Sequence, residues 1–155
     1  MRFPLKNLWI VLALLNISLL SHAAEKKILK SALPGPVART AEKQSKGATV
    51  RAYTKDTENG KVEYEVEMTL NGHSKDVSIG ADGGLLEVEE QVQIEALPAA
   101  VQQGLKQKAG KGVIRKIESI TKRDVIVAYE AQVTTLGKHR EIQVGPNGQT
   151  LDHEE

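Results

Sequence analysis

The sequence predicts an α+β fold of two tandem repeats, each a helix followed by a four-stranded antiparallel meander, with the helices covering one face of the sheet. Three observations predict it. The motif Ala-Leu-Pro occurs at 32–34 and again at 96–98. The two halves of the chain share residues at a nearly constant spacing, and segments with strand-like alternation follow each motif. Self-similarity of this kind indicates duplication of one structural unit.

The match between the halves is densest downstream of the first motif. At an offset of 65 positions, identical residues align without a gap as Val62 with Val127, Tyr64 with Tyr129, Glu65 with Glu130, Thr69 with Thr134, Gly72 with Gly137, Gly80 with Gly145, Gly83 with Gly148 and Leu86 with Leu151. We therefore expect one repeat over residues 32–94 and a second over 96–152.

Residues 1–24 have the three-part pattern of a secretory signal peptide. Arg2 and Lys6 precede an apolar run over 8–20, and Ala23 and Ala24 provide the small residues that signal peptidase recognises. The run is shorter than the roughly 20 residues that a bilayer span needs. We expect cleavage and a periplasmic or secreted mature protein without a stable membrane span; an uncleaved anchor is the alternative.

The composition of the remaining chain excludes several function classes. Of the 21 Lys and Arg residues, Arg2 and Lys6 lie in the signal segment, and the other 19 stand against 20 Asp and Glu, so the mature charge is −1. Because the only Phe and Trp also lie in that segment, three Tyr remain, too few for a basic, aromatic groove that binds nucleic acid. The absence of Cys excludes disulfides, a thiol nucleophile and thiolate metal sites.

Each repeat is expected to open with a helix, because Pro is favoured at the first helical position. The second helix has one apolar stripe, formed by Leu97, Val101 and Leu105 at intervals of four residues. Gly110 or Gly112 is expected to end it. The first helix, over about 37–47, has a thinner stripe.

Alternation of apolar and polar residues predicts the strands that follow. Residues 61–70 alternate strictly, and Asn71-Gly72 is a strong hairpin signal. This turn pairs Leu70 with His73, Met68 with Lys75, Val66 with Val77 and Tyr64 with Ile79; the turn at Leu136-Gly137 pairs Tyr129 with Val144 and Ala131 with Ile142. Further strands are expected at 49–56, 85–92, 113–121 and 150–151, and Tyr64 and Tyr129 should occupy equivalent buried positions.

The order of these motifs resembles the PepSY-like family, also called β-lactamase-inhibitor-like. The motifs are LPGPV, VEYEVEM and VSIGADGGLL in the first half, and LPAAV, VAYEAQV and IQVGPNGQTL in the second. The resemblance implies a curved sheet with helices on its convex side, an exported bacterial protein and no catalytic residues. It also implies binding or inhibition of another extracytoplasmic protein, such as a peptidase or a regulatory target, and no cofactor.

The polar face of the predicted sheet is the candidate partner-binding surface. Strand parity places on it the acidic residues Glu63, Glu65, Glu67, Asp76, Glu130 and Glu141. Such a surface would attract a basic partner through long-range electrostatics. Two alternatives stay open: the same face could bind a small ligand or a cation, or its charges could simply oppose edge-to-edge aggregation.

No residue pattern in the chain indicates an enzyme, a metal centre or a cofactor site. His73 and His139 lie at or beside turns and His153 in the tail, without the spacing of metal-ligand pairs. The segment KQKAGKG at 106–112 is interpreted as a cationic helix end rather than a phosphate site. We expect a non-enzymatic, monomeric protein with no cofactor, no metal-ligand motif and no nucleic-acid partner.

Overall fold

The computed structural model describes residues 26–58, 60–151, 153 and 155. In chain order its elements are β1 (Lys26–Ile28), the 3-10 turn η1 (Lys30–Ala32), α1 (Gly35–Gln44), β2 (Thr49–Glu58), β3 (Lys61–Leu70), β4 (His73–Gly80), β5 (Leu85–Gln91), the 3-10 turn η2 (Ile94–Ala96), α2 (Ala99–Ala109), β6 (Val113–Lys122), β7 (Val125–Thr135) and β8 (Lys138–Val144). The expected signal peptide, residues 1–24, lies outside the described residues.

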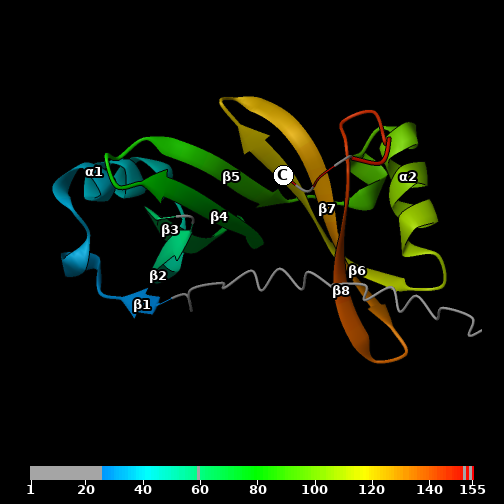
Figure 1. Ribbon diagram of the computed structural model, residues 1–155, viewed down its shortest axis with the longest axis horizontal. Helices are drawn as coiled ribbons and strands as arrows, with labels where there is room; N and C mark the ends of the chain where they lie inside the picture. The colour runs from blue at the N-terminus through cyan, green and yellow to red at the C-terminus, as the bar shows by residue number, and fades with distance from the viewer. Residues whose placement is uncertain (1–25, 59, 152, 154) are drawn as a thin grey trace, which may run out of the picture.

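The eight strands form one antiparallel sheet whose order follows the chain from β1 to β8 (Figure 1). Pairing of β5 with β6, from Val88 opposite Thr121 to Gln91 opposite Glu118, joins the two halves into a single sheet. The predicted fold class of two tandem helix-plus-four-strand repeats is therefore wrong.

Two further features depart from the predicted repeat. β1 precedes the first helix and pairs with β2, so the first half has an extra strand. Among the described residues, three strands follow α2, because the expected strand at 150–151 is reduced to an isolated bridge between Val144 and Thr150.

The two helices lie at opposite ends of the sheet, and each packs on its own core (Figure 1). The core beneath α1 contains Leu33, Val37, Ala41, Tyr64, Val66, Met68, Val77 and Ile79. The core beneath α2 contains Leu97, Val101, Leu105, Ala109, Ile117, Tyr129, Ala131, Val133, Ile142 and Val144. Tyr64 and Tyr129 are 7% and 8% exposed, so their predicted burial is confirmed.

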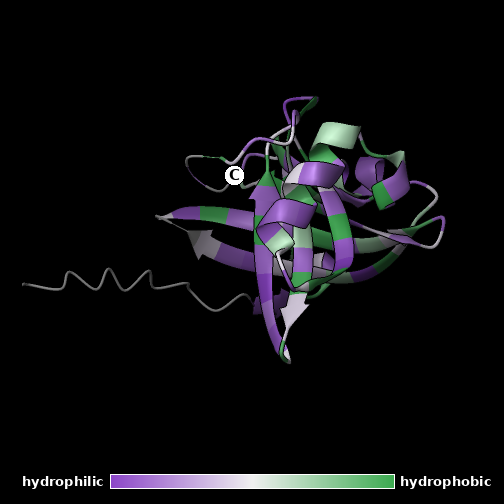
Figure 2. Ribbon diagram, turned by 90° about the vertical axis from the view of Figure 1, so that its right-hand side faces the viewer, coloured by the Kyte–Doolittle hydropathy of each residue, from purple (hydrophilic) through white to green (hydrophobic). Residues whose placement is uncertain are grey.

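The hairpins follow the predicted register. β3 and β4 pair Tyr64 with Ile79 and Leu70 with His73, while β7 and β8 pair Tyr129 with Val144, as the turns predict. The alternation that sets this register appears as bands of hydrophilic and hydrophobic residues along the strands (Figure 2). β2 and β6 also share an irregularity, at residues 51 and 115, where their pairing with the next strand shifts by one.

Each helix is held by a glycine turn at the end of a strand. Gly83, at φ 88°, lies so close to Pro36 that an added Cβ would come within 2.8 Å of its carbonyl carbon. Thr40 Oγ1 donates a hydrogen bond of 2.6 Å to the Gly83 carbonyl. Gly148 makes the equivalent approach to Ala100 of α2. Both helices pack on the same face of the sheet, and no helix among the described residues lies on the other face.

Candidate functional site

The sheet face opposite the helices carries acidic side chains on adjacent strands. We call it the acidic face, and its carboxylates are Glu63, Glu65 and Glu67 on β3, Asp76 on β4, Glu87 and Glu89 on β5, Glu118 on β6, Glu130 on β7 and Glu141 on β8. Their strand partners lie on the same face, since residues opposite each other in a sheet project to one side.

Three of these carboxylates converge at the centre of the sheet. Oxygens of Asp76, Glu89 and Glu118 lie within 4.8 Å of one another. Asp76 is directly opposite Glu89 in the β4–β5 pairing, and Glu118 reaches them from β6. Glu118 is only 3% exposed, whereas Asp76 and Glu89 are half-buried.

Cations offset part of this charge. Arg51 Nη2 lies 3.1 Å from Asp76 Oδ1, and Lys116 Nζ lies 2.6 Å from Glu118 Oε1. Ser74 Oγ also donates a hydrogen bond of 3.1 Å to Glu118 Oε1. These partners explain how a buried carboxylate is tolerated, because burial of a charge is costly unless it is paired and hydrogen-bonded.

The carboxyl group of Glu89 has a strongly raised pKa. Burial, followed by a hydrogen bond and charge repulsion from Glu87, raises the pKa of Glu89 from 4.5 to about 8. Burial also raises the pKa of Asp76, although Arg51 opposes the shift. At neutral pH the protonated form of Glu89 therefore predominates, so this carboxyl group adds little negative charge to the central cluster.

The structure brings some of the sequence-predicted residues together and separates others. Glu67 lies opposite Asp76, beside the central cluster. Glu130 lies opposite Glu118 and accepts a hydrogen bond of 2.8 Å from Gln143 Nε2. Glu63 and Glu65 lie farther along β3, and Glu141 is exposed on the terminal strand β8.

Sequence reasoning missed Glu118 and the cations that pair with the face. β6 has pairing irregularities at Ile114/Lys116 and at Ile120/Thr121, and each shifts the alternation on which strand parity depends. Ile117, Glu118, Ser119 and Ile120 are also buried in succession, on alternate faces of a strand inside the sheet. Only the single apolar–polar break at Glu118 in an otherwise strand-like segment could have indicated a buried acid.

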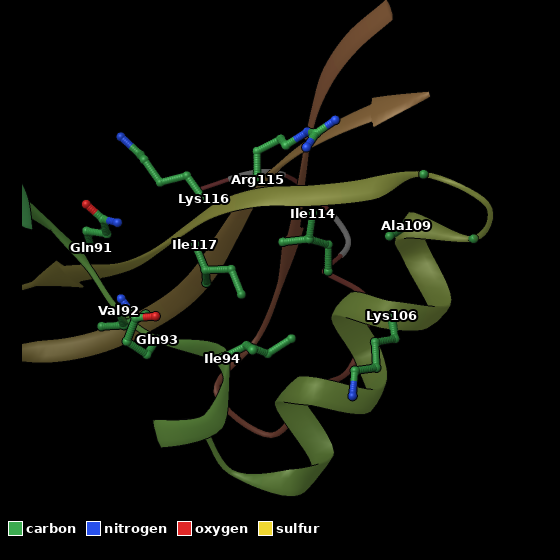
Figure 3. A pocket seen from close by; sticks show the side chains of 12 residues that line it. Gln91, Val92, Gln93, Ile94, Lys106, Ala109, Ile114, Arg115, Lys116 and Ile117 are labelled. Carbon is green, nitrogen blue, oxygen red and sulfur yellow. The ribbon is translucent and has the colours of Figure 1, made fainter. Parts of the chain in front are cut away.

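A separate hollow of about 400 Å³ lies on the helix side, between α2, β6 and the segment before η2. Figure 3 shows Ile114 and Ile117 pointing from β6 toward α2, with Ile94 pointing into the same space. Arg115 and Lys116 extend from the other side of the strand. In the first half Tyr53 takes the strand position of Ile117, since it pairs with Val66 as Ile117 pairs with Ala131. Ile117 is smaller than the Tyr53 that occupies the equivalent position in the first half, and the hollow lies beside it.

Comparison with solved structures identifies the fold. A candidate periplasmic protein from Bacteroides eggerthii matches with a TM-score of 0.62 and 17% identity, over 76% of this chain and 85% of that chain. A DUF2874 family protein from Bacteroides ovatus matches with a TM-score of 0.59 and 17% identity, over 77% and 84%. A BLIP-like protein from Bacteroides fragilis matches with a TM-score of 0.56 and 18% identity, over 79% and 84%.

These similarities show that the chain has a BLIP-like fold. No family model matches the sequence, and no curated protein matches it either. The expected periplasmic or secreted location agrees with the description of the Bacteroides eggerthii neighbour as periplasmic. Across the part of the chain that the structure describes, no helix combines the length and apolar composition needed to cross a membrane.

Proposed function

We propose that the chain is an exported, non-enzymatic, monomeric PepSY-like protein that binds or inhibits another extracytoplasmic protein through its acidic face. The single observation that carries this proposal is the position of both helices on one side of the sheet. Carboxylates on six adjacent strands consequently remain on a broad surface that neither α1 nor α2 covers.

The partner that this face fits is a basic protein surface. Positive charge on the partner would be drawn to the carboxylates of β3, β7 and β8, which accelerates encounter at low salt. The protonated Glu89 and the paired Asp76 and Glu118 give the centre of the face a nearly neutral, hydrogen-bonding character. This arrangement matches the general pattern of interfaces, in which charge is depleted at the core and concentrated at the rim.

A cation-binding role is the second candidate, because Asp76, Glu89 and Glu118 bring three carboxylate oxygens within 4.8 Å of one another. Such oxygens are suitable ligands for Ca²⁺. We rank this role second since Arg51 and Lys116 already pair with two of the carboxylates and Glu89 would first have to release a proton. A thermal-shift titration separates the candidates: a Ca²⁺-dependent rise in the melting temperature that Glu89→Gln abolishes would favour the cation.

The test of protein binding is capture from an extracytoplasmic extract followed by association kinetics. The double variant Glu65→Gln/Glu130→Gln removes two charges from the face while retaining shape and hydrogen-bonding groups. We expect it to associate with the captured partner severalfold more slowly at low salt, with the difference shrinking as salt rises.

The matched control is Glu42→Gln/Glu95→Gln, which removes the same charge from exposed positions on α1 and η2. This control should associate at the wild-type rate. Equal rates for the two double variants would rule out the acidic face as the binding surface.

A further inference from the structure

We propose that the end of the molecule formed by the β7–β8 turn and the α2–β6 loop docks on an anionic phospholipid bilayer. We call this end the basic tip and define it as residues 109–113 and 134–140. In Figure 1 the orange turn between β7 and β8 projects from the sheet on the side of α2, far from α1. This inference is independent of the binding role proposed for the acidic face.

The first observation is the exposure and backbone conformation of Leu136, at the apex of the turn. Its side chain is 100% exposed, and its backbone has φ 50°, in the left-handed region that disfavours branched apolar side chains. The corresponding turn of the first half places Asn71 at this position with φ 52°, and Asn tolerates that conformation. Leu136 thus costs backbone strain and hydrophobic exposure without contributing to packing, which points to an apolar surface outside the molecule.

A second apolar residue lies just behind the apex. Val113 is 51% exposed and pairs with Thr134, two residues before Leu136. The strand rise places it about 7 Å from the apex. The first half has Thr49 at the equivalent position, paired with Thr69. Interfacial segments insert about 5–10 Å into the headgroup and acyl boundary, so both side chains fall within that depth.

Cationic residues lie beside Leu136. Lys111, Lys138 and Arg140 line a hollow of about 490 Å³ beside Leu136, together with His139 and Thr135. The segments 106–116 and 134–140 contain no Asp or Glu. The Thr135 hydroxyl is buried and has no hydrogen-bond partner among the described residues.

Hydrogen bonds join the end of α2 to β8. Arg140 Nη2 donates to the carbonyls of Lys108 and Ala109, at 2.8 and 3.1 Å. Lys108 Nζ in turn donates to the Gln143 carbonyl at 2.8 Å. The cations of α2 and β8 are therefore presented together with Leu136.

An anionic bilayer is the occupant that fits both parts of the tip. Its phosphates complement the cations, and its acyl region accommodates a projecting apolar side chain. A soluble acidic protein would need a wider contact surface than one turn and one loop provide.

Vesicle flotation tests the proposal. The protein is recovered after export, and mass spectrometry first defines its N-terminus, so that binding by the apolar run over residues 8–20 is not measured instead. We expect binding to vesicles containing phosphatidylglycerol but not to pure phosphatidylcholine vesicles. Leu136→Asn should lower the partition coefficient by about tenfold through the lost apolar contact. Because it restores the residue type of the first turn, this variant should melt no lower than wild type.

The charge variant is Lys111→Glu/Lys138→Glu, which should lower partitioning by at least about 25-fold, at roughly fivefold per cation. Matched controls are Leu29→Asn, which removes a Leu that is 76% exposed near β1, and Lys55→Glu/Lys61→Glu, which reverses exposed charges of the first half. Both controls should partition as wild type does. No flotation with anionic vesicles, equal flotation with neutral ones, or wild-type partitioning of Leu136→Asn would each overturn the proposal.

Discussion

At the scale of single residues, Glu89 links the geometry of the acidic face to pH. Its carboxyl group lies between Asp76 on β4 and the buried Glu118 on β6. Burial and Glu87 raise the pKa of Glu89 to about 8, far above the value of 4.5 expected in the unfolded chain. The folded protein consequently keeps a proton that the unfolded chain releases.

The pH dependence of stability follows from this difference. The contribution of the protonated Glu89 is complete below pH 4.5 and is lost as the pH rises toward about 8, so the free energy of unfolding should fall over that window. Glu89→Gln, which is permanently neutral, should flatten this decline and raise the urea midpoint above that of wild type at pH 8. Urea unfolding at pH 5, 6.5 and 8 measures the free energy of unfolding of both proteins. If this free energy fell by the same amount with pH in wild type and Glu89→Gln, the raised pKa of Glu89 would be refuted.

Gly83 gives a second test at the residue scale. Gly83→Ala adds a Cβ that approaches Pro36 within 2.8 Å at φ 88°, whereas Gly72→Ala adds one with no neighbour within 4 Å at φ 85°. Gly72→Ala should cost about 1 kcal/mol from backbone strain alone. Gly83→Ala should cost about 2–4 kcal/mol, because steric overlap with the first turn of α1 is added. Equal losses in urea unfolding would mean that the turn does not hold the helix.

At the scale of elements, the hairpins were predictable and the sheet was not. Strict alternation in β3 and the Asn71-Gly72 turn determine the register of β3 with β4, since a shift of one residue would expose Val66 and Met68. The β5–β6 pairing has no such signal. The β5 segment presents Glu87, Glu89 and Glu90, and the irregularities of β6 hide the face on which Glu118 lies.

Tyr129 tests the energetic role of the core beneath α2. Tyr129→Ala should lower the free energy of unfolding by about 3–5 kcal/mol, the range for large-to-small changes in a packed core. Its ring is 8% exposed and packs with Leu105 and Val144 among others. Tyr53→Ala, at a partly buried position of the other core, serves as the comparison and should cost less. A Tyr129→Ala protein with the wild-type urea midpoint would contradict this core assignment.

At the scale of the whole molecule, charge is distributed unevenly although the mature chain is nearly neutral. Carboxylates gather on the sheet face, while the lysines and the arginine of 106–111 and 138–140 gather at one end. The sequence predicted the acidic residues Glu63, Glu65, Glu67, Asp76, Glu130 and Glu141 on one face. It could not predict that Arg51, Lys116 and Lys122 pair with carboxylates of that face. The alternation of residues along a strand does not determine which neighbouring strand a long side chain reaches.

The central claim is that the acidic face forms the contact with a protein partner. Carboxyl-specific chemical labelling, read by mass spectrometry with and without the captured partner, measures this most directly. We predict that complex formation reduces labelling of Glu65, Glu67 and Glu130, while Glu42 on α1 and Glu95 on η2 are labelled as before. Protection of Glu42 and Glu95 with unchanged labelling of the sheet-face carboxylates would contradict the claim.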